Sequence, residues 1–216
     1  MSMKAVIVPV TPLQQNCTVF WSSESMAGAV VDPGGDLDRI HAAIAEKGVT
    51  VEKILLTHGH ADHAAATARL ARDLGVSVWG PQEADRFWLE RLPEQAERFQ
   101  LGTAEAVTPD RWLADGDRVE VGGLAFDVYH CPGHTPGHIV FVEATERVAI
   151  VGDVLFRGSI GRTDFPQGDH EALIRSIREK LFPLGDDITC IPGHGPLTRI
   201  GDERATNPFV ADHLFA

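Results

Sequence analysis

Four short turns of this 216-residue chain carry histidine and aspartate residues at close spacing, and each turn follows an apolar run. The four turns read THGHADH, CPGHTPGH, VGD and CIPGHG. Their candidate ligands are His58, His60, Asp62, His63, His134, Asp153 and His194. Because binding sites form where strands end and turns converge, this arrangement predicts one site at an edge of a fold that contains β-sheets.

Apolar runs rich in β-branched residues alternate with segments of helical period, which predicts an α/β chain. Strands are expected over residues 4–10, 17–21, 28–31, 53–56, 76–79, 118–121, 124–130, 139–143, 148–151 and 188–191. Helices are expected over residues 36–47, 63–74, 81–91 and 169–181. Asp36 is expected to cap the first helix and Gly48 to end it, while Pro81 is expected to begin the third.

The order of these elements gives each half of the chain a sheet with outer helices. We therefore predict a four-layer αββα sandwich, formed by residues 1–216 as a single domain, with the site between the edges of the two sheets. Residues 93–115 have no clear period, and no regular structure is predicted for them.

Composition narrows the classes of function. The formal net charge of −12 is unfavourable for binding nucleic acid, whose phosphates require clustered lysine and arginine. No apolar run has membrane-spanning length, and the first ten residues are too short for a secretory signal. Cys17, Cys131 and Cys190 form no paired motif, which is typical of a reducing compartment. We expect a cytoplasmic protein with a small-molecule substrate and neither nucleic-acid nor membrane partners.

The ligand types and their spacing predict a pair of divalent metal ions. Residues two apart in an extended segment point the same way, so His58 and His60 can reach one ion. The first ion is assigned the ligands His58, His60, His134 and Asp153, and the second is assigned Asp62, His63, His194 and the bridging Asp153. Imidazole and carboxylate without thiolate suit zinc, which is the expected metal, and also iron or manganese.

Two divalent ions that share a water molecule lower its pKa from about 15.7 toward 7, and so supply a bridging hydroxide at neutral pH. Asp62 and Asp153 are expected to be catalytic as well as metal-binding. Two further residues are candidates for orienting the ligands by hydrogen bonds. They are Asp32, for which a turn role is the alternative, and His138, for which packing is the alternative. A cationic centre of this kind indicates hydrolysis of an anionic or carbonyl-bearing substrate.

The sequence resembles the metallo-β-lactamase superfamily, whose THxHxDH motif is matched from Thr57 to His63. The segments VDPGG, ILLTHGHADH, HCPGHTPGH, VGDVLF, GRTDFPQGD and IPGHGP resemble its glyoxalase II-like branch of hydroxyacylglutathione hydrolases. The likeness runs nearly end to end, and it is greatest to the compact bacterial members that consist of the metal domain alone. The seven ligands of that family fall on the seven positions derived above.

This resemblance implies hydrolysis of a glutathione thioester, of the S-lactoylglutathione type, to a hydroxy acid and free thiol. It also implies that Arg162, in GRTDF, holds a carboxylate of glutathione; an ion pair with Asp164 or Asp169 is the alternative. A thiol of pKa about 8.5 leaves as thiolate without a strong general acid. Two-domain members carry a further helical domain with glutathione contacts, whereas only residues 195–216 follow His194 here. Weaker glutathione binding, or another small thioester, is the expected consequence.

Other functions fit the sequence less well than thioester hydrolysis does. GRTDF also resembles the mononuclear iron persulfide dioxygenases of the same superfamily, in which counterparts of His58, His134 and Asp153 hold one metal. IPGHGP differs from the PAHDY pattern of that branch. A non-catalytic metal-binding module would require residues 93–115 to block the pocket. Charge disfavours a nuclease, and the missing signal segment together with Asp62 and no cysteine ligand disfavours a secreted β-lactamase.

Overall fold

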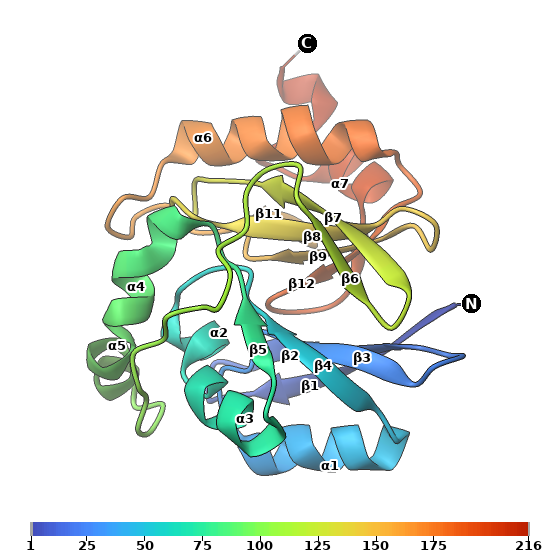
Figure 1. Cartoon of the computed structure of the whole chain (residues 1–216). Helices are drawn as coiled ribbons and strands as arrows, with labels where there is room; N and C mark the ends of the chain where they lie inside the picture. Colours follow the sequence, from blue (N-terminus) through green and yellow to red (C-terminus); the bar gives the residue numbers. More distant parts are fainter. Residues whose placement is uncertain (1, 216) are drawn as a thin grey trace.

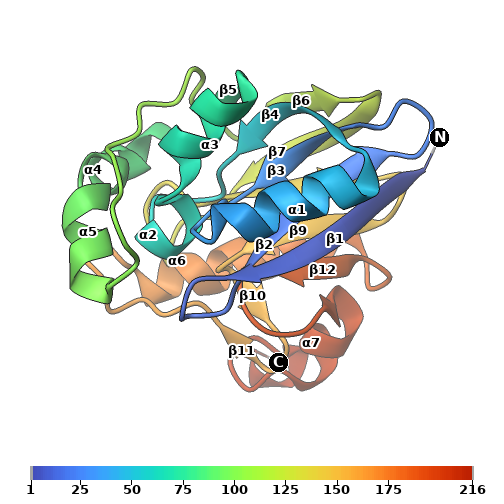
Figure 2. The same cartoon turned by 90° about the horizontal axis from the view of Figure 1, so that it is seen from below.

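The computed structural model describes residues 2–215 and contains two β-sheets packed face to face, with helices on both outer faces (Figure 1 and Figure 2). The first sheet has the strand order β1-β2-β3-β4-β5. Its strands are β1 (Met3–Val10), β2 (Gln15–Ser22), β3 (Ala27–Val31), β4 (Thr50–Leu55) and β5 (Ser77–Trp79). The first three strands are antiparallel, whereas β3, β4 and β5 run parallel.

The second sheet has the strand order β13-β12-β9-β8-β7-β6. Its strands are β6 (Arg118–Val121), β7 (Leu124–His130), β8 (Ile139–Glu143), β9 (Val148–Gly152), β12 (Thr189–Pro192) and β13 (Thr198–Arg199). β12 pairs with β9 in parallel, and the other neighbours are antiparallel. A short separate hairpin of β10 (Leu155–Phe156) and β11 (Ser159–Ile160) follows β9. The parallel pair places the ends of β9 and β12 side by side.

Helices cover the outer face of each sheet (Figure 1). The helical elements of the first half of the chain are α1 (Leu37–Lys47), α2 (Ala61–Ala64), α3 (Thr67–Leu74), η1 (Glu83–Asp85), α4 (Arg86–Glu90) and α5 (Leu92–Phe99), and α4 and α5 lie at the end of the sandwich. Those of the second half are α6 (His170–Arg175), η2 (Ser176–Leu181), η3 (Phe182–Leu184), α7 (Ile200–Thr206) and η4 (Asp212–Leu214). α1 and α3 pack on the first sheet, and α6 continues into η2 over the second.

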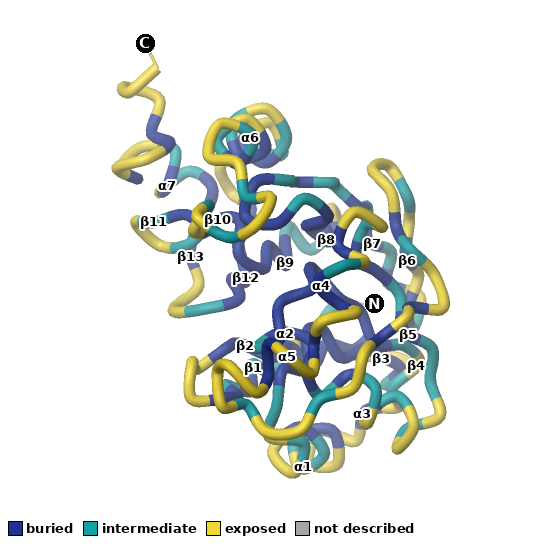
Figure 3. Tube along the Cα trace, turned by 90° about the vertical axis from the view of Figure 1, so that its left-hand side faces the viewer, coloured by how far each residue is buried: buried dark blue, intermediate teal, exposed yellow. Residues whose placement is uncertain are grey.

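Three apolar layers hold these four layers together. Ile40 and Leu70 belong to the layer between the first sheet and its helices. Phe20 and Phe126 lie between the two sheets, with ring centroids 4.6 Å apart, and Leu173 of α6 covers the second sheet. Figure 3 shows buried residues concentrated in the strands between the outer helices. Burial of each large apolar side chain contributes about 1.5–3 kcal/mol to the stability of the fold. The arrangement of the layers confirms the predicted αββα sandwich.

Every predicted strand is present to within three residues of its expected bounds. The helices expected over 36–47, with Gly48 at its end, and over 169–181 are also present, whereas the cap at Asp36 and the other two helix predictions are wrong in detail. Asp36 does not cap α1, because its carboxylate instead accepts a hydrogen bond from the backbone N–H of Thr11 at 2.8 Å. The helix expected over 63–74 is two helices, α2 and α3, because the N–H of Ala66 donates to the carbonyl oxygen of Pro33 at 3.0 Å. Both departures fasten the turn after β3 to its neighbours.

Pro81 does not begin a helix, since the helical turns start at Glu83, where the side chain of Gln82 caps the first turn by accepting the N–H of Ala84. Residues 93–115, for which no structure was predicted, contain most of α5 followed by an irregular segment. The hairpin β10–β11, strand β13 and helix α7 were also missed, because such short elements give no readable period. Among the described residues, no helix is long and apolar enough to cross a bilayer.

Candidate metal centre

Four strand ends on one side of the sandwich carry the predicted ligands. β4 leads into THGHADH, which enters α2 at Ala61, and β9 ends directly before Asp153. His134 follows β7, and His194 follows β12. β4 belongs to the first sheet and the other three strands to the second, so turns from both sheets meet here. The structure brings all seven predicted ligands together.

The ligands form two groups of three. The three-histidine group consists of His58, His60 and His134, and the mixed group consists of Asp62, His63 and His194. Within each group, the potential ligand atoms lie within 4.8 Å of one another. Oδ1 of Asp153 is 3.3 Å from Nε2 of His63. Oδ2 of Asp153 is 3.5 Å from Nε2 of His134 and 3.7 Å from Nε2 of His194. One carboxylate therefore reaches both groups.

Hydrogen bonds from Nδ1 orient three of the histidines. His63 donates to the carboxylate of Asp32 at 2.9 Å. His134 and His194 donate to backbone carbonyl oxygens at 2.7 and 3.2 Å. Because carbonyl and carboxylate oxygens only accept, each of these rings carries its hydrogen on Nδ1 and turns Nε2 toward the centre. Metal-binding histidines in proteins are oriented in this way.

Several polar atoms of the centre are buried and lack a hydrogen-bond partner among the described residues. They are Nε2 of His58, Nε2 of His60, Nε2 of His63 and Oδ1 of Asp153. A buried polar atom without a partner costs about 1–3 kcal/mol, and native structures contain few of them. Buried nitrogen and oxygen atoms without partners, set within a cluster of histidines and aspartates, fit a pair of cations.

The two groups differ in charge. Burial, reinforced by neighbouring histidines, lowers the pKa of His58 and His60 well below the usual range. Burial acts in the same direction on His63, but the carboxylates of Asp153 and Asp62 outweigh it and raise its pKa well above the usual range. The pKa of Asp153 is lowered despite burial, because His63 lies beside it. The mixed group attracts positive charge, and the three-histidine group offers neutral nitrogens.

Gly193 is required by the close approach of two ligands. A Cβ atom at this position would lie 2.2 Å from Oδ1 of Asp153 and 2.5 Å from Cε1 of His63. Both distances are far shorter than a van der Waals contact. The glycine before His194 therefore makes room for the carboxylate that joins the two groups.

Asp32 supports the ligands from beneath and is itself buried. Its carboxylate accepts hydrogen bonds from the N–H of Thr57 at 2.7 Å and from the Thr57 hydroxyl at 2.6 Å. The same carboxylate accepts Nδ1 of His63. Thr57, which the sequence analysis did not single out, also lies 3.0 Å from Nδ1 of His58. Asp32 therefore lies where an orienting residue is required.

His138, the other predicted orienting residue, lies beside the three-histidine group. Its ring stacks on that of His58, with centroids 4.7 Å apart. Burial lowers the pKa of His138 well below the usual range, and its Nε2 accepts the backbone N–H of Asp153 at 3.0 Å. His138 thus holds the strand end that presents the shared carboxylate.

Asp85 was missed by the sequence analysis. It is fully buried at the end of η1. Its carboxylate accepts hydrogen bonds from Gly59 N at 2.9 Å, Thr135 Oγ1 at 2.7 Å and Gly137 N at 2.6 Å. Burial raises its pKa to about 6, although the hydrogen bonds oppose the shift. The available signal was its position, since Asp85 stands four residues before buried Leu89 on the apolar face of a helical segment.

Phe165 and Trp88 flank the three-histidine group. Their ring centroids lie 4.7 and 4.6 Å from that of His60. The guanidinium of Arg162 lies over Phe165, 4.7 Å from its ring centroid, and pairs with Asp164 at 2.8 Å. This ion pair is the alternative role stated for Arg162 above. Its two side chains are 69% and 67% exposed, so the pair contributes little and opens readily.

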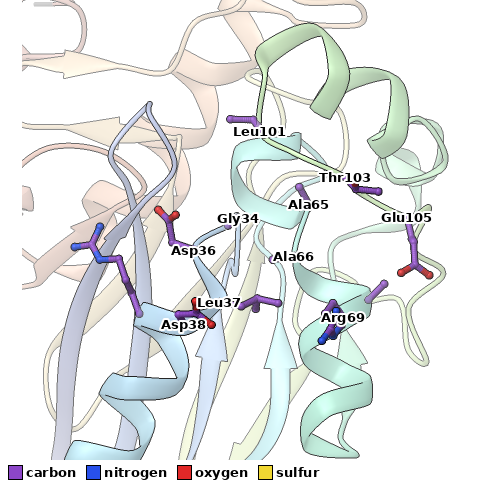
Figure 4. A pocket seen from close by; sticks show the side chains of 13 residues that line it. Gly34, Asp36, Leu37, Asp38, Ala65, Ala66, Arg69, Leu101, Thr103 and Glu105 are labelled. Carbon is purple, nitrogen blue, oxygen red and sulfur yellow. The ribbon is translucent and has the colours of Figure 1, made fainter.

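A cavity of about 560 Å³ lies behind the THGHADH turn, between the start of α1, the α2–α3 junction and the segment after α5 (Figure 4). Asp36, Arg39, Arg69 and Glu105 are among the residues that line it. Charges of both signs face this space, so no ligand charge is favoured. None of the described lining residues is a predicted ligand, and the candidate centre is therefore the ligand cluster and not this cavity.

Residues 10–194 match the family model of the metallo-beta-lactamase superfamily. This range extends from the end of β1 to the last of the seven candidate ligands. The chain therefore belongs to the metallo-β-lactamase superfamily, as the motifs predicted.

Individual relatives agree with this assignment. The hydroxyacylglutathione hydrolase GloC of Haemophilus influenzae is 51% identical over 209 residues, which cover 96% of this chain and 98% of that protein. The crystal structure of the B3 metallo-β-lactamase BLEG-1 has 35% identity and a TM-score of 0.88, covering 96% of this chain and 99% of that one. TTHA1623, solved in a di-iron-bound form, is 36% identical with a TM-score of 0.86, covering 95% and 100%.

Proposed function

We propose that the protein is a metal-dependent hydrolase that cleaves a glutathione thioester, of the S-lactoylglutathione type, to a hydroxy acid and free thiol. The observation that carries this proposal is the contact of Asp153 with both ligand groups, which makes a single centre for two ions. The 51% identity to a hydroxyacylglutathione hydrolase supports the substrate class.

The centre is proposed to hold two divalent ions, with zinc as the expected metal. One ion would be held by His58, His60, His134 and Asp153, and the other by Asp62, His63, His194 and Asp153. Iron also suits these donors, and the related TTHA1623 has been solved with two iron ions. When bound, such a pair supplies hydroxide from water at neutral pH and polarises a carbonyl oxygen.

The residues of the chain position the reactants. The pKa of Asp62 is lowered, because His63 and His194 beside it outweigh burial. Asp62 and Asp153 therefore stay ionised, and we assign them the catalytic role of accepting hydrogen bonds from the attacking water. Phe165, whose ring centroid lies 4.7 Å from that of His60, is assigned the role of shielding the thioester carbon from bulk solvent on this side. The glutathione thiol, with a pKa of about 8.5, leaves as thiolate without a strong general acid.

Arg162 is proposed to bind a carboxylate of glutathione. Its guanidinium lies over the ring of Phe165, which in turn contacts His60, so it stands at the rim of the centre. A substrate carboxylate can replace Asp164 without loss of an ion pair, because both offer the same bidentate partner. A local positive charge also offsets the net charge of −12, which repels anionic glutathione.

Two assays and a metal analysis test this proposal. We expect two equivalents of zinc per chain, loss of thioester absorbance with S-lactoylglutathione, and no oxygen uptake with glutathione persulfide. Lactoyl-coenzyme A, the same acyl group on another thiol, is the matched control and should be hydrolysed more slowly. One iron per chain with oxygen uptake would identify a persulfide dioxygenase instead. Two bound metals without either activity would favour a non-catalytic metal-binding module.

A further inference from the structure

The carboxylate of Asp85 fastens two ligand-bearing turns to each other. Gly59 separates the two histidines of the HGH sequence, and its N–H donates to Oδ2 of Asp85 at 2.9 Å. Thr135 follows the third histidine of the three-histidine group, and its hydroxyl donates to the same oxygen at 2.7 Å. The N–H of Gly137 donates to Oδ1 at 2.6 Å. The first turn comes from one sheet and the second from the other, so Asp85 bridges the two sheets.

A second residue of the same helical segment holds the other side of the HGH turn. Gln95 accepts a hydrogen bond from the N–H of Ala61 at 3.2 Å, and its Nε2 donates to the carbonyl oxygen of Gly59 at 3.4 Å. A Cβ at Gly59 would lie 2.6 Å from Cβ of Trp88, so this turn lies directly against α4. The Gly59 residue is thus held at its N–H by Asp85 and at its carbonyl by Gln95.

Packing alone does not explain an aspartate at position 85. A buried carboxylate without a cationic partner is costly, and no basic side chain among the described residues is paired with Asp85. An apolar residue would fill the same space without that cost. All three donors of Asp85 belong to turns that carry ligands, so its hydrogen bonds serve the geometry of those turns.

We propose that Asp85 is a positioning residue, which fixes the separation of the two turns and thereby sets the affinity of the three-histidine group for its metal ion. Nδ1 of His60 and Nε2 of His134 face each other across these turns at 3.0 Å. Metal–ligand distances tolerate deviations of only about 0.2 Å, so a small separation of the turns weakens binding. This inference rests on the metal centre proposed above.

Asp85→Asn tests the role at nearly constant volume. Whichever way the amide turns, its NH2 group faces a donor, so either Gly59 or Gly137 loses its acceptor. We expect the metal of the three-histidine group to bind about 10–100-fold more weakly, as for other residues that orient ligands. Competition with a chromophoric chelator measures both metal equivalents, and His134→Ala identifies the one that belongs to this group. Hydrogen exchange at the two glycine amides should be faster in the metal-free variant.

Glu203→Gln provides a matched control. Glu203 is also a buried carboxylate, and it accepts hydrogen bonds from Thr198, Gly158 and Asn207, outside the four ligand turns. It should lower the melting temperature of the metal-free protein as Asp85→Asn does, while leaving both metal affinities unchanged. Unchanged affinities in Asp85→Asn, or an equal loss in both variants, would overturn the proposal.

Thr135 provides a milder variant if Asp85→Asn does not fold. Thr135→Val removes one donor at constant volume and should weaken only the metal of the three-histidine group, whereas Thr135→Ser keeps the hydroxyl and should bind as the wild type does. Equal affinities of the two variants would refute the role of Asp85. Wild-type protein that bound no metal would refute the metal centre itself, so the two failures are distinguishable.

Discussion

The two ligand groups share Asp153 but differ in burial and in protonation. The three-histidine group is buried, and burial lowers the pKa of each of its members. In the mixed group, the pKa of His194 is raised because hydrogen bonding to Asp62 outweighs burial, and the side chain is 29% exposed. The three-histidine group thus presents neutral nitrogens to a metal ion, whereas a metal ion that binds the mixed group must displace protons from it. Two sites that share a carboxylate can therefore load under different conditions.

Removal of the shared carboxylate should abolish metal binding by both groups at once. Asp153→Ala takes away the carboxylate whose oxygens lie 3.3 to 3.7 Å from histidines of both groups. We expect loss of both metals and a fall in turnover of more than about 100-fold, beyond the 10–100-fold typical of residues that only orient a ligand. Elemental analysis and thioester hydrolysis measure the two effects. His134→Ala and His194→Ala should each lose one metal; retention of both metals in Asp153→Ala would contradict the bridging assignment.

Crowding the contact between the groups should be nearly as harmful. The Cβ of Gly193→Ala would collide with Asp153 and His63, and overpacking of this kind costs about 1–3 kcal/mol. We expect reduced metal content and turnover. Gly195→Ala is the control, since a Cβ there meets nothing and φ is 75°. It should lose about 1–2 kcal/mol of stability through backbone strain alone and keep both metals. Full metal content in Gly193→Ala would show that the site tolerates the collision.

Lower pH should separate the two groups. The pKa of His63 is raised above its usual 6.5, so near neutral pH it holds a proton that a metal must displace. The pKa of His58 is lowered, so it stays neutral there. As pH falls from about 8 to 6, the mixed group should lose up to about tenfold in affinity per unit for each proton displaced, whereas the three-histidine group should change little. Chelator competition across this range measures both; parallel curves would contradict the comparison.

The layers, and the convergence of the seven candidate ligands on one place, were predictable because their signals are local. Histidine and aspartate at the ends of apolar runs indicate both metal binding and its location at strand ends. Runs of β-branched residues predict the strands themselves. Asp32 and His138 also lie beside ligands, as expected. Their orienting roles differ from turn and packing roles only through contacts between distant segments, which a local pattern does not contain.

The residues that were missed act through tertiary contacts. Asp85 hydrogen-bonds residues 26 to 52 positions away, and no spacing rule relates such partners. Asp36 is a residue type that commonly caps helices, but the backbone N–H of Thr11, in the turn between β1 and β2, takes its carboxylate as acceptor instead. Pattern rules describe what a segment does alone, so they fail where a neighbouring segment offers the stronger partner.

Substitutions of Arg162 and Asp164, at the rim of the centre, should have the smallest effect on activity, and that effect should be confined to the side of the three-histidine group. The backbone oxygen of Arg162 accepts Nδ1 of His134, while its guanidinium pairs with Asp164. Exposed ion pairs contribute about 0.2–1 kcal/mol, so Arg162→Ala should raise KM for S-lactoylglutathione about two- to fivefold with kcat and metal content unchanged. Asp164→Asn frees the guanidinium and should shift KM in the opposite direction. If steady-state kinetics show the same KM in both variants, the ion pair is the whole role of Arg162.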